Sequence, residues 1–306
     1  MKLTRLILPA LLGLAGASSH ATTLLAPGLG SFAVLGASSA TNTGATISNT
    51  GPTMLTGNLG VSNNSSITGI TGFFGTLANE GPGRATGTVH QGDAYSTLAD
   101  TELTLAKSSL ALLGPGTTLG ADLTGLTLNP GTYTVLAGTT NLTGALTLDG
   151  GGNKNAYWVF HLPSTLITSS SSFMNVINTG SGAGVYWDVG SSATLGANST
   201  FMGNILASAS ITFDSGVTMG CGRALAHTGA VTMISDTVNA GDCRGLVVAG
   251  SKGLSGGLEV AEAGGLPRAL AFSPIAAVPE PESYALLLAG LGLVGTVVKR
   301  RKTQKA

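Results

Sequence analysis

A motif of one threonine between two apolar residues recurs at nearly constant spacing between residues 191 and 239. It stands at Ala193–Leu195, Ile211–Phe213 and Val231–Met233, whose first residues are 18 and 20 positions apart. Gly, Ser, Asn and Asp fill the intervals, and these residues turn the backbone at low steric cost. A unit of about 20 residues is too short for a strand-helix-strand crossover, which needs roughly 30. It suits one coil of a parallel β-solenoid, in which each short strand stacks on the strand before it.

The alternation within each motif predicts which side chains face outward. Successive side chains of a strand point to opposite sides, so the apolar residues should face the core and the threonines should form an outer row. The pattern continues less regularly upstream, at residues 142–147 and 166–168. The candidates for the outer surface are Thr43, Thr46, Thr50, Thr53, Thr143, Thr147, Thr168, Thr194, Thr212 and Thr232.

The first four of these candidates come from a Thr-Gly-x-Thr tetrapeptide, which occurs at 43–46, 50–53, 68–71 and 124–127. Spaced hydroxyls on a rigid strand could order water. The competing interpretation is that each Thr-Gly pair makes a turn at a coil corner, and for any single copy this is the stronger interpretation.

The pattern changes between residues 93 and 113, where apolar residues recur every three or four positions and predict one amphipathic helix. Asp93 can cap its start, and the Gly114-Pro115-Gly116 sequence stops it. The stripe that this helix should bury along the side of the solenoid consists of Tyr95, Leu98, Ala99, Leu103, Ala106, Leu110 and Leu113.

Both ends of the chain are typical of targeting segments. Residues 1–21 have two basic residues, a short apolar run and small residues before Ala21, which predicts a secretory signal peptide. At the other end, Pro279, Glu280 and Pro281 precede an apolar segment at 285–298 and a basic cluster. That segment is shorter than a spanning helix normally is, although transient spanning is possible, and we include a transmembrane helix among the expectations.

Removing both ends makes the remaining chain mildly acidic. The signal takes two basic residues and the C-terminal segment takes five basic and two acidic ones, which leaves seven basic against twelve acidic residues. Phosphate binding needs clustered Lys and Arg, so nucleic acid is not an expected partner. Between the two ends we expect a solenoid domain at 22–245 and a flexible linker at 246–277, because the latter is rich in Gly, Ser and Ala.

The two cysteines, Cys221 and Cys243, should pair in an oxidising compartment, with two buried free thiols as the alternative. Catalytic signatures are lacking in the sequence. The acidic residues are scattered, His90, His161 and His227 have no partners at metal-ligand spacing, and no serine stands in a Gly-x-Ser-x-Gly elbow. We therefore expect no enzyme activity, no metal and no cofactor.

The chain also resembles a known family. The segments LGSFAVLGASSATNTGATISNTG, LTGALTLDGGGNKNAYWVFHLPSTLIT and GVYWDVGSSATLGANSTFMGNILASASITFDSGVT are similar, in sequence and order, to the ice-binding protein family, over about residues 24–242. This resemblance implies an all-β fold: a right-handed parallel β-solenoid of triangular section with one long helix alongside. It also implies that one flat Thr/Ser-rich face binds ice and inhibits crystal growth or recrystallisation, and the threonines named above are then the ice-contact candidates.

The C-terminal sequence from 278 to 306 resembles the PEP-CTERM sorting signal, which implies processing by an exosortase at the inner membrane. The expected product is exported to the cell surface or the medium after transient inner-membrane contact. The alternative function is a cell-surface or biofilm-matrix protein that uses the same scaffold as a structural or adhesive module, with extracellular polysaccharide as its partner.

Overall fold

The computed structural model describes residues 21–37, 47–62, 69–75, 80–136, 138–243, 251–275 and 288–291. Contacts divide the chain into two units, 1–273 and 274–306. The described part of the first unit is mostly β-structure in parallel sheets, as predicted. In the second unit, residues 288–291 form one helical turn.

The parallel strands form three series, and each circuit of the chain adds about one strand to each. The seven-stranded sheet contains β12 (Thr140–Leu142), β15 (Leu166–Thr168), β18 (Ala193–Leu195), β20 (Ile211–Phe213), β22 (Val231–Ile234), β3 (Ile47–Thr50) and β6 (Ile70–Thr71). The helix-side series contains β9 (Thr117–Leu119), β11 (Gly131–Val135), β14 (Tyr157–Leu162), β17 (Gly184–Val189), β19 (Thr200–Ala207), β21 (Thr218–Ala226), β2 (Phe32–Gly36), β5 (Asn58–Val61) and β8 (Val89–Gln91).

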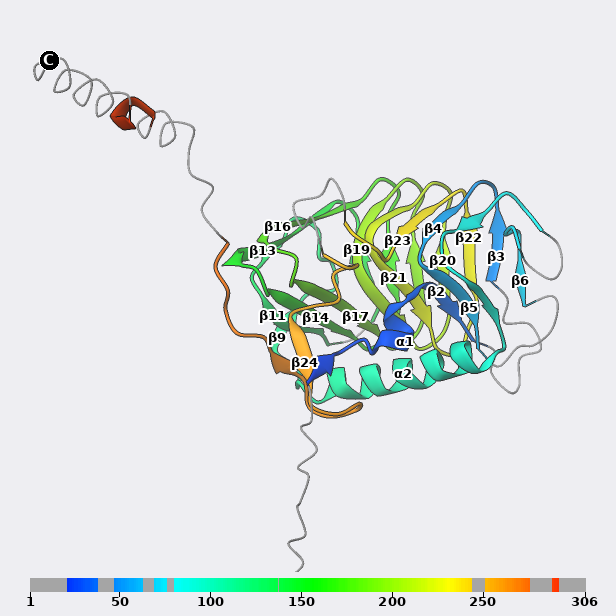
Figure 1. Cartoon of the computed structure of the whole chain (residues 1–306), viewed down its shortest axis with the longest axis horizontal. Coiled ribbons are helices and arrows are strands. Elements are labelled where there is room, and N and C mark those ends of the chain that lie inside the picture. The colour runs from blue at the N-terminus through cyan, green and yellow to red at the C-terminus, as the bar shows by residue number, and fades with distance from the viewer. Residues whose placement is uncertain are drawn as a thin grey trace, which may run out of the picture. The chain divides into compact units, whose positions relative to one another are not determined.

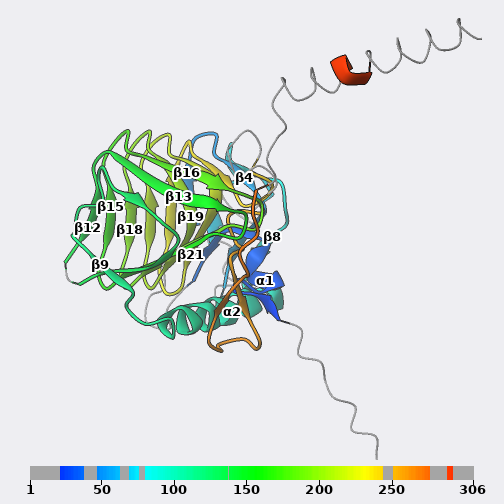
Figure 2. The same cartoon turned by 90° about the vertical axis from the view of Figure 1, so that its left-hand side faces the viewer.

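The third series, which we call the β10–β7 series, adjoins both others. It contains β10 (Thr127–Leu128), β13 (Ala145–Asn153), β16 (Phe173–Thr179), the N-terminal ends of β19 and β21, β23 (Thr237–Asn239), β4 (Met54–Thr56) and β7 (Arg84–Ala85). Because β19 and β21 pair in two series, one continuous sheet of fifteen strands results. Figure 2 shows β12, β15 and β18 on one side of the stack and β13 and β16 on another.

The coils are not stacked in sequence order. From β9 to β23 they follow one another along the stack, but β22 then pairs with β3 and β23 pairs with β4, so the earliest coils complete the far end. Helix α2 (Ala94–Ala111) connects β8 at that end with β9 at the other, and it runs along the stack in Figure 1. Its 18 residues span about 27 Å at 1.5 Å per residue. Six strand spacings of about 4.8 Å make roughly 29 Å, so the helix matches the length of the seven-stranded sheet.

The inside of the coils is filled by large apolar side chains. The ring planes of Phe160 and Trp187 stack with centroids 4.0 Å apart, Tyr133 extends this stack on one side, and the Phe201 ring packs against Trp187 at an interplanar angle of 47°. Trp187 is buried and its indole Nε1 donates to the Met202 carbonyl at 3.0 Å. The strand register shows that Tyr133, Phe160 and Trp187 occupy equivalent inward positions on successive coils, and Ile205 follows them on the next strand.

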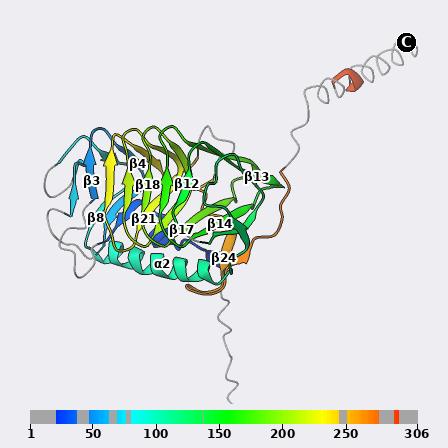
Figure 3. The same cartoon turned by 180° about the vertical axis from the view of Figure 1, so that it is seen from behind.

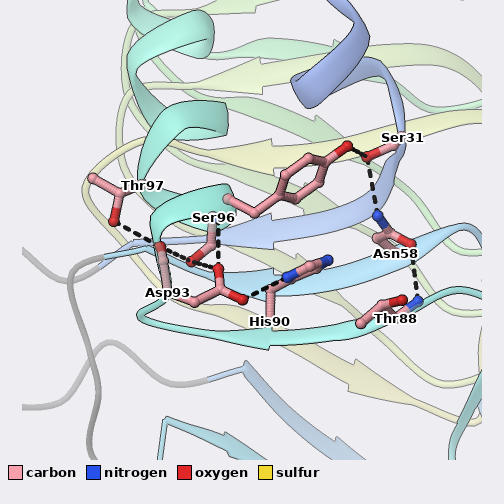
Figure 4. A network of polar contacts seen from close by, with 8 residues as sticks. Ser31, Asn58, Thr88, His90, Asp93, Ser96 and Thr97 are labelled. Carbon is pink, nitrogen blue, oxygen red and sulfur yellow. Dashed lines mark hydrogen bonds and ion pairs between the residues drawn. The ribbon is translucent and has the colours of Figure 1, made fainter.

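Helix α2 lies where the sequence predicts it, and its first turn is capped as expected. Figure 4 shows the Asp93 carboxylate accepting from the backbone N–H of Ser96 at 2.8 Å and facing the His90 ring at 2.6 Å. The buried stripe is rotated from the predicted one: Ala99, Leu103, Ala106 and Leu110 are buried, but Tyr95 and Leu98 are 39% and 50% exposed. The small Ser96 and Ser109 take the buried positions instead, which lets the helix approach the strands closely.

A second apolar core lies between α2 and the outer side of the helix-side series. The strands contribute Val159, Tyr186, Leu206 and Leu225, and residues near the N-terminus add Leu25 and Leu29, the latter in α1 (Pro27–Gly30). The helix covers this side of the stack, so the helix-side series presents no broad outer surface along its length.

The prediction of a flexible linker at 246–277 is wrong for residues 251–275. Strand β24 (Leu258–Val260) pairs antiparallel with β1 (Thr22–Thr23) and β25 (Arg268–Ala269), and Leu254 and Leu258 are buried. The glycine content suggested flexibility, but glycine here allows two backbone segments to pack closely. A Cβ added at Gly256 would lie 2.2 Å from the Gly182 carbonyl oxygen.

A disulfide lies just before this C-terminal segment in the chain, and a buried arginine contacts the segment itself. Cys221 and Cys243 form a disulfide with a Cα–Cα distance of 5.3 Å, as predicted. The guanidinium of Arg223, 3% exposed, donates to the carbonyls of Gly30 and Gly253 and to Asn204 Oδ1. This buried cation therefore joins α1, β19 and the C-terminal segment.

The expectation of a transmembrane helix gains no support. In the described residues, no helix has both the length and the apolar character that crossing a membrane requires. Most of the apolar segment at 285–298 lies outside the described residues, as do residues 1–20 of the expected signal peptide and Pro279, Glu280 and Pro281.

Lys107, Asp188 and His161 form a polar clamp that connects α2 to the strands, and its contribution to stability can be tested. Lys107 Nζ donates to Asp188 Oδ1 at 2.5 Å and to the Leu206 carbonyl at 2.8 Å, and His161 Nδ1 lies 3.2 Å from Asp188 Oδ2. Burial favours the protonated carboxyl, but the hydrogen bonds from His161 and Lys107 and the charge of Lys107 outweigh it, so the pKa of Asp188 lies below its ordinary value.

We expect Lys107→Met to lower the free energy of unfolding at pH 7 by about 1 to 3 kcal/mol, because a largely buried carboxylate loses its cationic partner. Since the folded pKa is depressed, this contribution should be complete above about pH 5 and should fade below about pH 4. Denaturant unfolding at several pH values measures both effects. Lys252→Met, at an exposed lysine, is the control, and an equal loss in both variants would contradict the clamp.

Candidate functional site

Two outward rows of side chains run along the stack, one residue per coil. The first, the Thr212 row, lies on the seven-stranded sheet, whose β3, β12 and β18 are labelled in Figure 3. The strand register places the central threonines of three neighbouring coils side by side, as the repeat predicts. The Thr212 row consists of Asn141, Ile167, Thr194, Thr212, Thr232, Ser48 and Thr71.

The second row, the Thr218 row, lies on the β10–β7 series. It is equally continuous and consists of Ala145, Phe173, Thr200, Thr218, Thr237, Met54 and Arg84. The strands here are longer, so a second column begins two residues further along. That column contains Thr127, Thr147 and Asn175 at one end and Asn239 and Thr56 at the other.

The two rows differ in exposure. Thr218 and Thr237 are exposed, and Met54 and Phe173 are 48% and 44% exposed. In the Thr212 row, Thr212 and its two threonine neighbours are only partly exposed. The Thr218 row therefore offers more of its methyl and hydroxyl groups to the solvent.

The hydroxyls of the Thr218 row are also unengaged. Within the described part of the chain, no side-chain hydrogen bond involves Thr200, Thr218 or Thr237. Beside the Thr212 row the neighbouring hydroxyls are used: Ser192 Oγ accepts from the Ser210 backbone N–H at 3.3 Å, and Ser210 Oγ accepts from the Ala230 N–H at 3.2 Å. The hydroxyls of Thr194, Thr212 and Thr232 make no side-chain hydrogen bond in the described residues either, so exposure, and not hydrogen bonding, separates the threonines of the two rows.

Two of the predicted surface threonines are in fact buried. Thr168 is 3% exposed and its Oγ1 accepts from the Gly196 N–H at 2.9 Å. Ile167 pairs with Thr194, so Ile167 takes the outward position and Thr168 points inward by the alternation of the strand. Thr53 is fully buried in the corner between β3 and β4, where Gly51 has a φ of +97°. For that Thr-Gly-x-Thr copy the turn interpretation is confirmed.

The remaining ice-contact candidates do not lie on one surface. Thr147 lies in the second column beside the Thr218 row, and Thr50 is exposed at the end of β3. Thr143 is exposed at a coil corner, where its Oγ1 lies 2.9 Å from Thr124 Oγ1. Thr43 and Thr46 lie outside the described residues.

The sequence reasoning missed Thr200, Thr218 and Thr237. A signal for them exists, because they recur at 18 and 19 residues through the same stretch as the first motif and each precedes an apolar residue that is buried. The motif search required apolar residues on both sides of the threonine. At these three positions the preceding residue is Ser199, Val217 or Asp236, so only the middle copy fits that search.

The histidines have partners that sequence spacing did not show. His161 faces Asp188, and His227 Nδ1 lies 3.1 Å from Asp100 Oδ1, so both link the strands to α2 or to its clamp. In the described residues, no cluster of three or more His, Cys, Asp or Glu side chains could hold a metal ion.

Fold and surface together define a class of protein: parallel β-sheets, covered on one side by a long helix, that present two regular outward rows with three neighbouring threonines in each. The rows are almost free of charge, with Arg84 at one end as the charged member. A surface of this kind matches a partner that is itself periodic.

The chain belongs to the ice-binding-like family, whose family model matches residues 41–239. It is 44% identical over 209 residues to an ice-binding protein of Nostoc sp. (strain HG1), which covers 68% of this chain and 71% of that protein. A second family model, the PEP-CTERM protein-sorting motif, matches residues 277–302.

Solved structures agree with this family. The crystal structure of an ice-binding protein from the Antarctic ascomycete Antarctomyces psychrotrophicus has a TM-score of 0.61 and 35% identity, over 71% of this chain and 98% of that one. An ice-binding protein from an Arctic yeast gives a TM-score of 0.61 and 26% identity, over 69% and 91%.

The burial of Thr168 leads to a prediction. Thr168→Val keeps the shape of the side chain but leaves the buried Gly196 N–H without an acceptor, which should cost about 1 to 3 kcal/mol of unfolding free energy. Thr194→Val, at the partly exposed neighbouring row, should change it by less than about 0.5 kcal/mol. Thermal or denaturant unfolding compares the two variants, and equal costs would show that Thr168 has no special structural role.

Proposed function

We propose that this chain is an exported protein that binds ice through the surface centred on the Thr218 row and so slows crystal growth or recrystallisation. The observation that supports this most directly is the register of seven outward residues on neighbouring strands, with exposed Thr218 and Thr237 at its middle. Family membership and the ice-binding relatives support the same function.

The physical basis is a match of spacings. Neighbouring strands lie about 4.8 Å apart, and alternate residues along a strand lie about 6.7 Å apart. Row and second column therefore form a two-dimensional grid at the two ends of the series, where Thr147, Asn175, Asn239 and Thr56 stand beside the row, and a single row between those ends. Threonine suits this grid because its β-branching restricts χ1 and keeps each group in place. Ordered groups hold surface water in fixed positions, and an ice plane can continue that order.

We favour the Thr218 row over the Thr212 row for three reasons. Its side chains are more exposed, its strands supply a second column, and its flanking apolar residues, Met54 and Phe173, add hydrophobic contact area. The Thr212 row is narrower and its flanking serines are bonded to the backbone. The threonines first expected to contact ice, Thr194, Thr212 and Thr232, then form a neighbouring face and not the main contact.

We infer the finer description of the scaffold and its processing in the same way. The three strand series are consistent with a right-handed solenoid of triangular section, one side of which carries α2. The PEP-CTERM motif supports export, C-terminal processing by an exosortase and transient contact with the inner membrane before release to the cell surface or medium. A scaffold that acts by adsorption needs no catalytic group, so the protein is proposed not to be an enzyme.

Paired tyrosine substitutions test which surface binds. Thr218→Tyr places a large ring in the middle of the proposed contact surface and should reduce thermal hysteresis and recrystallisation inhibition about tenfold, equivalent to about 1.4 kcal/mol of adsorption free energy. Thr212→Tyr, the matched control on the neighbouring face of the same coil, should retain most of the activity. Purified residues 22–278 are measured by nanolitre osmometry and by ice-grain growth, with circular dichroism to show that both variants fold.

The reverse pattern, activity lost in Thr212→Tyr alone, would transfer the contact to the seven-stranded sheet. If the unmodified protein leaves ice grains unchanged at micromolar concentration, ice binding is refuted. The structural or adhesive function at the cell surface, with extracellular polysaccharide as partner, would then be the remaining hypothesis.

A further inference from the structure

The corner that leads into the Thr218 row contains buried polar residues at the equivalent place in four of the coils, with the apolar Val217 at that place before Thr218. Ser172, Ser199, Asp236 and Thr53 are 2%, 1%, 1% and 0% exposed, and each directly precedes a member of the row. Among these four, Asp236 carries the only charge. A buried carboxylate beside an otherwise uncharged surface requires an explanation, because burying a charge is costly unless hydrogen bonds compensate it.

The Asp236 carboxylate binds two coils at once. Its Oδ1 accepts from the Val217 N–H at 2.8 Å, in the coil that carries Thr218, and its Oδ2 accepts from the Ile234 N–H at 2.6 Å in its own coil. The residue between Ile234 and Asp236 is Ser235, which has a φ of 60°. This left-handed conformation is unfavourable for a serine, and the two hydrogen bonds hold the turn on which it depends.

The backbone of Asp236 continues the connection to the next coil. Its N–H donates to Thr53 Oγ1 at 2.9 Å, and its carbonyl accepts from the Met54 N–H at 2.8 Å. Thr53 Oγ1 in turn donates to Asn49 Oδ1 at 2.6 Å. Asp236 therefore holds the backbone next to three consecutive members of the row. It binds the Val217 N–H before Thr218, it directly precedes Thr237, and it accepts from the Met54 N–H.

We propose that Asp236 is a positioning residue of the ice-contact surface: its buried carboxylate sets the relative orientation of Thr218 and Thr237, while its backbone N–H and carbonyl hold the corner before Met54. This inference rests on the proposed function for its activity readout. Asp236 does not reach the surface itself, so it acts only through the backbone of its neighbours. Loss of its hydrogen bonds leaves the coils stacked, because their ladder bonds remain, but frees the corner to move.

The ionisation of Asp236 supports the same role. Burial raises the pKa of Asp236 to about 6, and this outweighs the hydrogen bonds from Ile234, Val217 and Gly216 that lower it. The negative charge of the exposed Asp214 raises the pKa of Asp236 further. Because the folded pKa lies above the ordinary 3.8, proton uptake between pH 6 and 4 stabilises the fold, while it weakens the acceptor for the Val217 and Ile234 N–H groups. Activity and stability should thus change in opposite directions.

The test is Asp236→Asn, which keeps the shape but replaces one acceptor oxygen by an NH₂ group that opposes a backbone N–H. Thermal hysteresis per folded molecule at pH 7 should fall about threefold to tenfold, a range that corresponds to a partial loss of surface order. Asp214→Asn, which removes an exposed charge one coil away, is the matched control and should leave hysteresis unchanged. Between pH 7 and 5 the unmodified protein should lose activity, whereas Asp236→Asn should show little pH dependence in that range.

A destabilised variant remote from the ice-contact surface distinguishes a positioning role of Asp236 from a purely structural one. Leu103→Ala opens a cavity under α2 and lowers stability, yet it should keep full hysteresis at temperatures far below its unfolding midpoint. Amide hydrogen exchange gives a readout that needs no ice: Asp236→Asn should accelerate exchange at Val217, Thr218 and Thr237 by tenfold or more, while Thr194 and Thr212 stay protected.

The outcomes distinguish the two hypotheses. If Thr218→Tyr is inactive but Asp236→Asn keeps full activity and unchanged exchange at Thr218, the positioning role is refuted and the ice-contact surface stands. If the unmodified protein has no ice activity, the proposed function fails, and the exchange experiment still decides whether Asp236 orders the corner. Uniformly faster exchange throughout the stack would reduce Asp236 to a general stabilising residue.

Discussion

The structure depends on backbone hydrogen bonds between coils. Most strands of the seven-stranded sheet are only three or four residues long, and each finds its partners in the coil before or after it. Buried N–H and C=O groups must be paired, so a single coil has no stable form and the stack exists only as a whole. The regular outer rows follow from this requirement, because pairing in register brings equivalent side chains to the same height on every coil.

A stack of strands has two ends, and helix α2 connects them. It carries the chain from one end to the other, so that coils distant in sequence pair at β22 and β3. Its buried stripe covers one side, and the Lys107–Asp188 contact fixes its position along the axis. Covering one side leaves the seven-stranded sheet and the β10–β7 series as the open faces. The choice between them depends on exposure and strand length.

The repeat of about 20 residues and the alternation of side chains along each strand decided how much of the surface could be predicted. The spacing of Thr194, Thr212 and Thr232 gave their adjacency correctly, since an apolar residue on each side fixes the alternation. The same reasoning failed at Thr168, because a shift of one residue exchanges inside and outside and the Leu-Ile-Thr sequence allows either. It also passed over Thr200 and Thr237, whose preceding residues Ser199 and Asp236 are polar or charged although they are buried, and over Thr218, which follows the apolar Val217.

The sequence by itself determined the coil period, the long helix with its Asp93 cap and the family, and it favoured the cysteine pair that the structure contains. Each of these is encoded locally or in a repeat, and hydrophobic alternation and capping act over a few residues. Only the tertiary structure decided that the first coils join the last, that residues 251–275 are packed, and that Asp236 sits beneath the Thr218 row. These features arise from contacts between residues far apart in the chain, such as Asp236 with Thr53, which no local pattern specifies.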